Sequence, residues 1–239
     1  MTRFTKILIG LIAFTYTLNA AEVYATFTVE AEKKAMLAFD ASGITQKVNY
    51  EIADRVKRGA VLASLVNADS KANLESAKTA LKFAKKDYER QLKVKDLIDE
   101  GKFDQYAFKY ENAKNKLAFA QAQYDKTYLK APFNGVVYEK NIEVGDTVSG
   151  MMLKTVFKIQ SKSKRKLILG FDQKYHKSVK VGQSFRYGVD GDEKEYRGVI
   201  TKVYPFANSG NRKIKAEVKA KDFVVGLFGE GYITIPDAK

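Results

Sequence analysis

The sequence predicts a mostly β fold, with a small β-sandwich that is split by an α-helical coiled-coil hairpin and followed by a small β-barrel. Three features of the 239-residue chain support this prediction. A β-rich segment recurs at a constant offset of 92 residues, the segment between its two copies has helical periodicity, and short β runs separated by turn residues follow residue 165.

Composition excludes several classes of protein. The chain contains no cysteine, so neither a disulfide framework nor a cysteine zinc site can form. The net charge is +14, but the lysines are spread along the chain and often alternate with acidic residues. No nucleic-acid recognition motif accompanies them, so we expect no nucleic-acid partner.

The amino terminus predicts a cleavable secretory signal. Arg3 and Lys6 precede an apolar run over residues 7–18, and small residues follow at Ala20 and Ala21. The apolar run is shorter than the roughly 20 residues that a membrane-spanning helix needs. We therefore expect export after removal of residues up to Ala20 or Ala21, although an uncleaved anchor or a buried strand remains an alternative.

The repeat is a strand–turn–strand pattern that occurs twice. The matching pairs are Gly43 and Gly135, Ile44 and Val136, Glu51 and Glu143, Ile52 and Val144, Asp54 and Asp146, and Val56 and Val148. Two positions differ between the copies. Ala53 stands opposite Gly145, and Gly59 and Gly150 are displaced by one residue from the constant offset. Each half is too small to bury a core alone, so we expect the two halves to pair as one sandwich.

Residues 67–127 contain no proline and one glycine, Gly101, and are rich in good helix formers. Apolar residues recur at alternating spacings of three and four in both arms: Leu74, Ala77, Leu81, Ala84 and Tyr88, then Tyr106, Tyr110, Ala113, Leu117, Ala120 and Tyr124. This seam predicts a two-helix coiled coil with its reversal at Gly101 and Asp104 as the N-cap of the second helix. One layer of a larger helical domain is the alternative, but the charged outer faces favour a projecting hairpin.

The remaining residues predict the barrel. Its strand candidates are 167–171, 184–189, 198–204, 214–218 and 231–235, with one helical turn near 172–177. Asp190, Gly191 and Asp192 are typical of a hairpin turn, because the further ligands of a calcium loop are missing. The predicted organisation is a signal peptide (1–20), an N-terminal strand leading into barrel or sandwich (21–40), the first sandwich half (41–66), the hairpin (67–127), the second half (128–160) and the barrel (161–239).

This order of elements resembles the periplasmic adaptor, or membrane fusion protein, family of HlyD type. The most specific segment is residues 129–137, Leu-Lys-Ala-Pro-Phe-Asn-Gly-Val-Val, followed by Val-Gly-Asp-Thr-Val at 144–148. Residues 43–65 are similar to the family's first half-motif, except that Ala53 stands where glycine is usual. The resemblance implies a lipoyl-like barrel-sandwich hybrid with turn positions at Gly43, Asp54, Gly59, Pro132, Gly135, Gly145 and Asp146.

The resemblance also implies a function. Family adaptors are not enzymes and need no cofactor; they link an inner-membrane transporter to an outer-membrane channel protein and self-associate into a ring. We therefore expect a periplasmic protein, associated with the inner membrane through a transporter, most simply of the resistance-nodulation-division type, that supports export of drugs or small molecules. At the hairpin tip, Lys93, Leu97 and Asp104 match the family's Arg, Leu and Ser docking positions, with the leucine kept and the other two replaced.

Other functions remain as alternatives. A lipoyl or biotinyl carrier shares the sandwich, but the turn that would present its modified lysine is replaced here by the hairpin. The single histidine, His176, is most simply a surface residue. Adaptors of ABC-type or metal-efflux systems also fit the fold, although soft metal ligands beyond Met36, Met151 and Met152 are missing from the exported chain.

Overall fold

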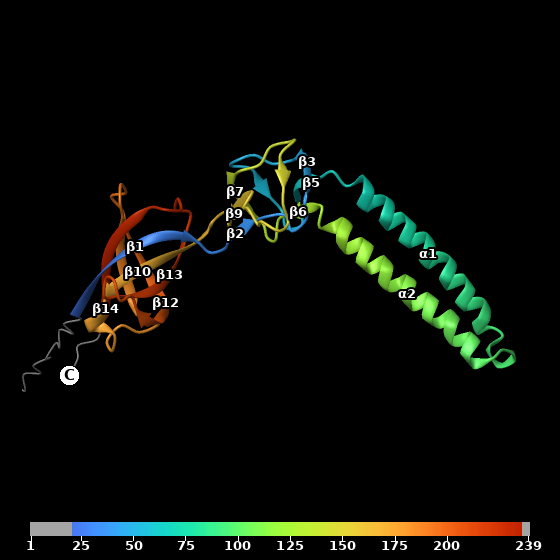
Figure 1. Ribbon diagram of the computed structural model, residues 1–239. Helices are drawn as coiled ribbons and strands as arrows, with labels where there is room; N and C mark the ends of the chain where they lie inside the picture. Colours follow the sequence, from blue (N-terminus) through green and yellow to red (C-terminus); the bar gives the residue numbers. More distant parts are fainter. Residues whose placement is uncertain (1–20, 236–239) are drawn as a thin grey trace, which may run out of the picture. The chain divides into compact units, whose positions relative to one another are not determined.

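The computed structural model describes residues 21–235, which divide into two units. One unit comprises residues 21–30 and 164–235, and the other comprises residues 31–163 (Figure 1). The predicted signal segment lies outside the described residues. Within residues 21–235, no helix is both long and apolar enough to cross a bilayer.

The first unit is a closed six-stranded barrel. Its strands follow the order β1-β10-β13-β12-β11-β14 around the barrel. Their bounds are β1 Ala21–Ala31, β10 Lys164–Asp172, β11 Ser184–Val189, β12 Glu195–Ala207, β13 Lys213–Lys221 and β14 Phe228–Ile235. The short helix η2, Gln173–Tyr175, is the helical turn that the sequence predicted near this position.

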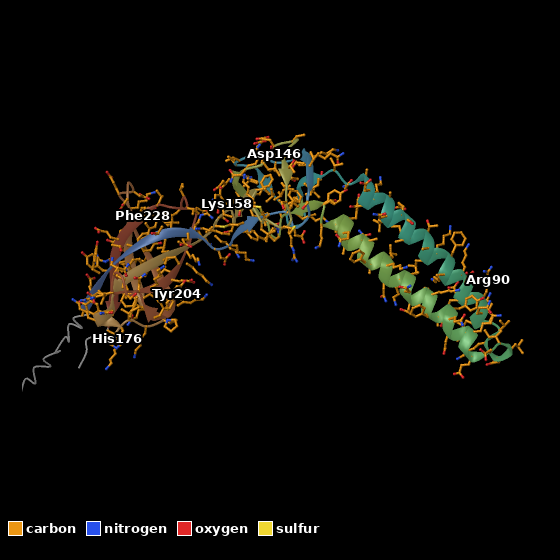
Figure 2. The ribbon with its side chains drawn as sticks, viewed as in Figure 1. Arg90, Asp146, Lys158, His176, Tyr204 and Phe228 are labelled. Atoms are coloured by element: carbon orange, nitrogen blue, oxygen red, sulfur yellow. The ribbon has the colours of Figure 1, made fainter. Side chains whose placement is uncertain are left out.

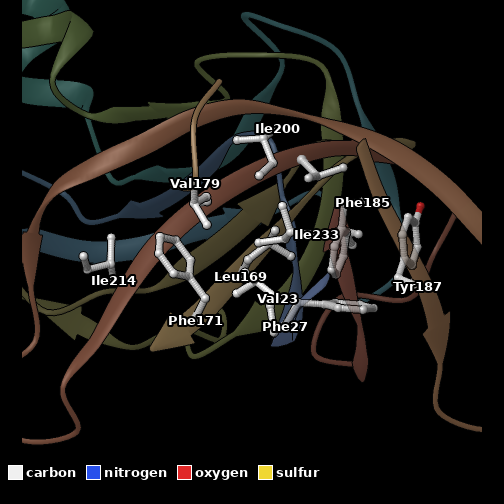
Figure 3. Close-up of a cluster of buried hydrophobic side chains, with 14 of the residues drawn as sticks. Val23, Phe27, Leu169, Phe171, Val179, Phe185, Tyr187, Ile200, Ile214 and Ile233 are labelled. Carbon is white, nitrogen blue, oxygen red and sulfur yellow. The ribbon is translucent and has the colours of Figure 1, made fainter. Parts of the chain in front are cut away.

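The buried side chains, which alternate with exposed ones along the strands, fill the interior of the barrel. Every second residue of β14 is buried, as expected for strands with one face toward a core. Phe27 packs edge-on against Phe185 and Tyr187, with ring centroids 5.9 and 5.4 Å apart (Figure 3). Because β1 comes from the start of the described chain, this core joins residues almost 160 positions apart.

The second unit contains the predicted sandwich of two four-stranded sheets. Their orders are β2-β9-β7-β4 and β6-β5-β3-β8. The bounds are β2 Lys34–Leu37, β3 Gly43–Val48, β4 Arg55–Val56, β5 Val61–Leu65, β6 Tyr128–Lys130, β7 Gly135–Lys140, β8 Thr147–Val148 and β9 Phe157–Gln160. Each sheet contains strands from both copies of the repeat, so neither half forms a sheet of its own.

The two repeat turns have the same internal hydrogen bonds. The amide of Glu51 donates to the carboxylate of Asp54 at 2.7 Å, and the amide of Glu143 donates to that of Asp146 at 2.8 Å. In both copies the aspartate amide donates back to the glutamate carbonyl, at 3.1 and 3.2 Å. The side chain of aspartate thus closes each turn locally.

The turns also exchange hydrogen bonds across the sandwich. The amide of Ala53 donates to the carbonyl of Val137 at 2.9 Å, and the amide of Gly145 donates to that of Thr45, also at 2.9 Å. Val137 is the repeat counterpart of Thr45, so the two contacts are equivalent and reciprocal. The hydroxyl of Thr45 is buried with no hydrogen-bond partner among residues 21–235, whereas Val137 places a methyl group at the equivalent position.

Ala53 adopts the backbone conformation that its glycine counterpart adopts. Its φ is +75°, against +96° at Gly145. The departure from the family pattern therefore leaves the turn unchanged, and alanine occupies a left-handed conformation that disfavours any residue with a Cβ atom.

The hairpin is formed by α1, Ala68–Leu92, and α2, Glu100–Asp125, with the 3₁₀ turn η1, Lys95–Leu97, between them (Figure 1). The predicted seam is confirmed. All eleven seam residues are buried or half-buried, and the helices pack chiefly on each other. Helix α2, with 26 residues, is about 39 Å long at ~1.5 Å per residue.

One expectation about the hairpin is wrong. The N-cap of α2 is Asp99, not Asp104, because the Asp99 carboxylate accepts a hydrogen bond from the amide of Lys102 at 3.0 Å. Gly101 therefore lies in the first turn of α2 and does not end a helix. A Cβ atom at Gly101 would lie 3.2 Å from Oδ1 of Asp99, so glycine leaves room for the capping carboxylate.

The paired turns generate a stability prediction. Ala53→Gly should stabilise the protein by about 0.5–1 kcal/mol, since relief of a left-handed conformation worth ~1–2 kcal/mol exceeds the added entropy of the unfolded chain. Gly145→Ala is the matched control and should destabilise by about the same amount, because the space around its Cβ position is open and only φ opposes the change. Urea unfolding of both variants measures this, and equal destabilisation by the two would contradict it.

Candidate docking site at the hairpin tip

The base of the hairpin is attached to the sandwich through two paired strands. Helix α1 follows β5 and α2 leads into β6, and these strands are hydrogen-bonded neighbours. The amide of Leu65 donates to the carbonyl of Thr127 at 2.9 Å, and Nδ2 of Asn67 lies 2.9 Å from the hydroxyl of Tyr128. Both helices therefore leave the sandwich side by side with a fixed register.

An aromatic cluster closes the seam at the other end of the hairpin. Tyr88 on α1 stacks on Tyr110 with ring centroids 5.3 Å apart and contacts Phe103 at 5.6 Å. Phe103 is 8% exposed, and the ammonium of Lys95 lies 5.1 Å from its ring centroid. These side chains close the seam at this end of the hairpin, and Lys95 of the reversal contacts them.

The reversal presents Leu97 to solvent. Leu97 is the last residue of η1 and is 85% exposed, and it is flanked by the exposed Leu92 and Val94. At this exposure Leu97 is not part of the core of the hairpin. The backbone of the reversal is hydrogen-bonded internally, with Leu97 N donating to Val94 O at 2.9 Å. A large apolar side chain held on a defined turn is typical of an interaction surface.

The other two predicted tip residues are also exposed. Lys93 is the C-cap residue of α1, and Asp104 lies one turn into α2. All three residues lie at the end of the hairpin remote from β5 and β6, where Figure 2 also shows Arg90. Their role in docking stays a prediction.

Some of the predicted lipoyl-like turn positions form turns or allow close packing of strands, and others have no such constraint. Asp54, Gly145 and Asp146 form the equivalent turns, and Gly59, with φ +83°, donates its amide to Ala131 O at 2.8 Å. At Gly135 a Cβ atom would lie 2.5 Å from the carbonyl oxygen of Gln160, so only glycine allows β7 to approach β9. The remaining positions bear on packing less directly.

Gly43 has ordinary space around its Cβ position, and Pro132 is exposed at the entry to β7. The two repeat glutamates are joined by Lys140, whose ammonium lies 2.6 Å from Glu143 and 3.0 Å from Glu51. Hydrogen bonds to Glu143 and then Glu51 raise the pKa of Lys140. Lys140, Glu51 and Glu143 therefore connect the two halves of the sandwich.

A metal-binding cluster does not accompany these features in the part of the chain that the structure describes. Among residues 21–235, no group of three or more His, Asp or Glu side chains is arranged to hold a metal ion. His176 is exposed, with Nδ1 3.2 Å from the carbonyl oxygen of Gln173, consistent with a surface residue at the end of η2. The turn that carries the lysine in carrier domains is replaced by α1 and α2.

Two features of the hairpin differ from or add to what its sequence pattern predicts. Asp99 followed by Glu100 is a signal for a helix start. With Gly101 interpreted as the reversal, however, the start of the second helix is predicted at Asp104. Phe83, Phe108 and Phe119 lie outside the seam and are exposed, and the seam pattern assigns them no role. Because these three residues do not follow the three-and-four spacing of the seam, the sequence already indicates that they face away from the partner helix.

Comparison with known proteins agrees with this architecture. Residues 33–160 match the family described as CzcB-like, barrel-sandwich hybrid domain. The cobalt-zinc-cadmium resistance protein CzcB of Cupriavidus metallidurans is 24% identical over 204 residues, which is 78% of this chain and 39% of that protein. The chain thus spans about two fifths of the length of this relative.

Two solved structures share the fold. A MacA–MexA chimera that contains the Pseudomonas aeruginosa MexA α-hairpin has a TM-score of 0.83 at 22% identity, covering 92% of this chain and 82% of the chimera. The membrane fusion protein Spr0693 from Streptococcus pneumoniae R6 has a TM-score of 0.71 at 16% identity, covering 89% and 98%.

The attachment at β5 and β6 predicts that the hairpin can be removed. Replacing residues 68–126 by a short glycine-containing turn should leave a folded protein, because Thr127 and the β5–β6 pairing are retained. Circular dichroism should show lost helix and retained strand signal with a cooperative thermal transition. As a control, the same replacement combined with Leu65→Asp should fail to fold, because it buries a charge in the sandwich. If the protein with the hairpin replaced alone is unfolded, the hairpin belongs to the core.

Proposed function

The chain belongs to the CzcB-like barrel-sandwich hybrid family, and on this premise we propose that it is a periplasmic adaptor that links an inner-membrane efflux transporter to an outer-membrane exit duct. Its partners would then be a transporter, of the resistance-nodulation-division type, and a channel protein. The protein acts by holding these two in contact and catalyses no reaction.

The observation that carries the proposal is the exposed Leu97 on a hairpin whose seam is closed without it. Leu97 is 85% exposed, whereas Phe103 of the seam is buried. The base of the hairpin is held by β5 and β6, so the tip can contact a partner without disturbing the sandwich. Docking of a few apolar side chains into a groove between helices needs this arrangement.

Charge at the tip influences the partner that is selected. Lys93 and Arg90 lie next to the reversal, and Arg90 is paired with Asp87 within α1. Exposed charges of this kind contribute little to affinity but discriminate between partners through attraction and repulsion. Lys93 keeps the positive charge of arginine without its planar set of donors, whereas Asp104 adds a negative charge where serine is neutral, so the duct would differ in charge where it faces Asp104.

We propose that the exported cargo is divalent metal cations and not drugs. The sequence taken alone favoured drugs or small molecules, but the matching family is described as CzcB-like, and the CzcB relative is named a cobalt-zinc-cadmium resistance protein. An adaptor supports export by assembling the pump, so it needs no metal site of its own for this function.

The docking proposal predicts the behaviour of tip variants. Leu97→Asp should lower cargo tolerance of cells to that of a strain lacking the protein, because loss of a central apolar contact costs about 2 kcal/mol or more. Lys93→Ala should have a smaller effect, since an exposed charge is screened by salt. Growth under cargo stress, measured beside thermal melting of each purified variant, tests both.

Leu97→Ile is the matched control for this experiment. It keeps the apolar area, so both tolerance and melting should stay at the level of the unchanged protein. A normally folded Leu97→Asp variant with full tolerance would exclude the tip as the docking surface. An unfolded Leu97→Asp variant would contradict the conclusion that the side chain is free of the core.

The cargo proposal is tested separately. A strain lacking the gene should become sensitive to cobalt, zinc or cadmium and retain its tolerance of hydrophobic drugs, as measured by minimal inhibitory concentrations. The reverse pattern would support drug export and overturn the assignment of metal cations, while leaving the adaptor role unaffected.

A further inference from the structure

A cavity of about 720 Å³ lies at one end of the barrel, between η2 and the end of β12. Val203 and Ile214, which pack on the core of the barrel, line its inner side. The rings of Tyr204 and Phe206 also line it, with centroids 5.9 Å apart; Figure 2 labels Tyr204 here together with His176. A largely apolar cavity of this size is typical of a site that takes a small organic molecule.

The cavity is formed by a bulge in β12. The pairing of β12 with β13 shifts register so that residues 204–206 lie opposite a single residue of β13. Pro205 stands at the centre of the bulge, where its lack of an amide hydrogen costs no ladder hydrogen bond. The hydroxyl of Tyr204 donates to the carboxylate of Glu217 at 2.7 Å and so fixes the position of the ring. The bulge therefore holds two aromatic rings at the wall of the cavity.

The rim of the cavity is basic. Lys174 in η2 and His176 at its end are exposed and line the cavity. Among residues 21–235, neither side chain forms an ion pair. None of the described residues that line the cavity is acidic. The carboxylate of Asp172, the nearest acidic residue along the chain, instead accepts a hydrogen bond from the amide of Lys174 at 2.8 Å.

The imidazole of His176 has one nitrogen left for a ligand. Its Nδ1 lies 3.2 Å from the carbonyl oxygen of Gln173. Because a carbonyl oxygen only accepts hydrogen bonds, Nδ1 carries the hydrogen in this contact and Nε2 stays available. The cavity thus combines an apolar inner side and aromatic wall with polar groups at one edge, which complements a molecule that has an apolar body and an acidic group.

We propose that this cavity binds a small organic acid with a flat apolar body, of the class of the aromatic carboxylates. The body packs against Tyr204 and Phe206, and the carboxylate faces Lys174 and His176 at the rim. This binding site does not depend on the adaptor role. Its ligand is an anion, in contrast to the metal cations proposed as cargo, and it lies on the barrel, in a different unit of the chain from the hairpin tip.

The form of the cavity favours a single molecule over a lipid surface. Insertion into a bilayer needs several apolar side chains that project together from one face. Among the described residues that line the cavity, only Phe206 is a large apolar residue with an exposed side chain, at 59%. Val203 and Ile214 are instead held back against the core of the barrel.

The charge of the ligand is tested with two probes of equal shape, 2-naphthoate and its neutral counterpart 2-naphthamide. Isothermal titration calorimetry of the purified full chain should show saturable 1:1 binding of both. The affinity for naphthoate should be about threefold to fivefold higher, because an exposed charge pair contributes modestly. A lack of saturable naphthoate binding, or equal affinities for the two probes, would overturn the proposal.

Variants of the rim and the wall should affect the two probes differently. Lys174→Gln should lower the affinity for naphthoate to about that for naphthamide and leave naphthamide binding unchanged. Lys177→Gln is the matched control, because Lys177 is exposed but does not line the cavity, and it should change neither affinity. An equal loss of naphthoate binding in the two lysine variants would contradict the assignment of Lys174.

Phe206→Ala should weaken the binding of both probes about fivefold or more, since the lost ring contact serves the shared apolar body. Phe228→Ala is the matched control, because Phe228 is similarly exposed at the start of β14, outside the cavity (Figure 2). It should leave both affinities unchanged. Thermal melting of each variant checks its folding, and a loss in Phe228→Ala as large as that in Phe206→Ala would overturn the proposal.

Two further measurements locate the site without relying on variants. In nuclear magnetic resonance spectra of the ¹⁵N-labelled protein, naphthoate should shift the amide signals of residues 173–177 and 203–207, apart from proline. Shifts confined to other parts of the chain would overturn the proposal. Phosphatidylglycerol vesicles should leave the protein in the supernatant on centrifugation. Pelleting with these vesicles, together with a lack of naphthoate binding, would assign this end of the barrel to a membrane surface and overturn the proposal as well.

Discussion

Reciprocal pairing between the two copies of the repeat is the constraint on which the second unit depends. Ala53 donates to Val137 and Gly145 donates to Thr45, each at 2.9 Å, so each turn is completed by a strand of the other half. The same exchange places β5 next to β6. Since α1 follows β5 and α2 precedes β6, the hairpin inherits its position and register from the sandwich.

The stability of the hairpin comes from its seam and not from its surface charges. The pairs Lys78–Glu75, Lys85–Glu89 and Lys114–Glu111 are all largely exposed, and such pairs contribute about 0–1 kcal/mol each. The aromatic cluster of Tyr88, Phe103 and Tyr110 instead excludes water where the helices meet. Side chains on the outer faces and at the reversal are therefore free to serve contacts with other molecules.

Two such surfaces are separate in the structure. Leu97 lies on the reversal, whereas Phe108 and Phe119 lie along the side of α2. Contacts at the tip are directed along the hairpin, and contacts at the side are directed across it.

The sequence by itself determined the order of elements. The 92-residue repeat predicted a sandwich shared by two halves, and the seam from Leu74 to Tyr124 predicted the paired helices, because burial imposes a period on the order of apolar and polar residues. It also placed Leu97 at the reversal. These features depend on residue type at regular spacing, which needs no knowledge of distant contacts.

The tertiary structure alone decided the details at turns and helix ends. Asp99, not Asp104, caps the start of α2, because its carboxylate reaches the amide of Lys102 and Gly101 leaves space for it. Ala53 holds a left-handed conformation because its amide is bonded to Val137, a residue 84 positions away. The exposure of Phe108 and Phe119 follows from which side of α2 faces α1. Each of these depends on a contact between residues distant in sequence or on a choice between near-equal local options, and a local pattern contains no information about either.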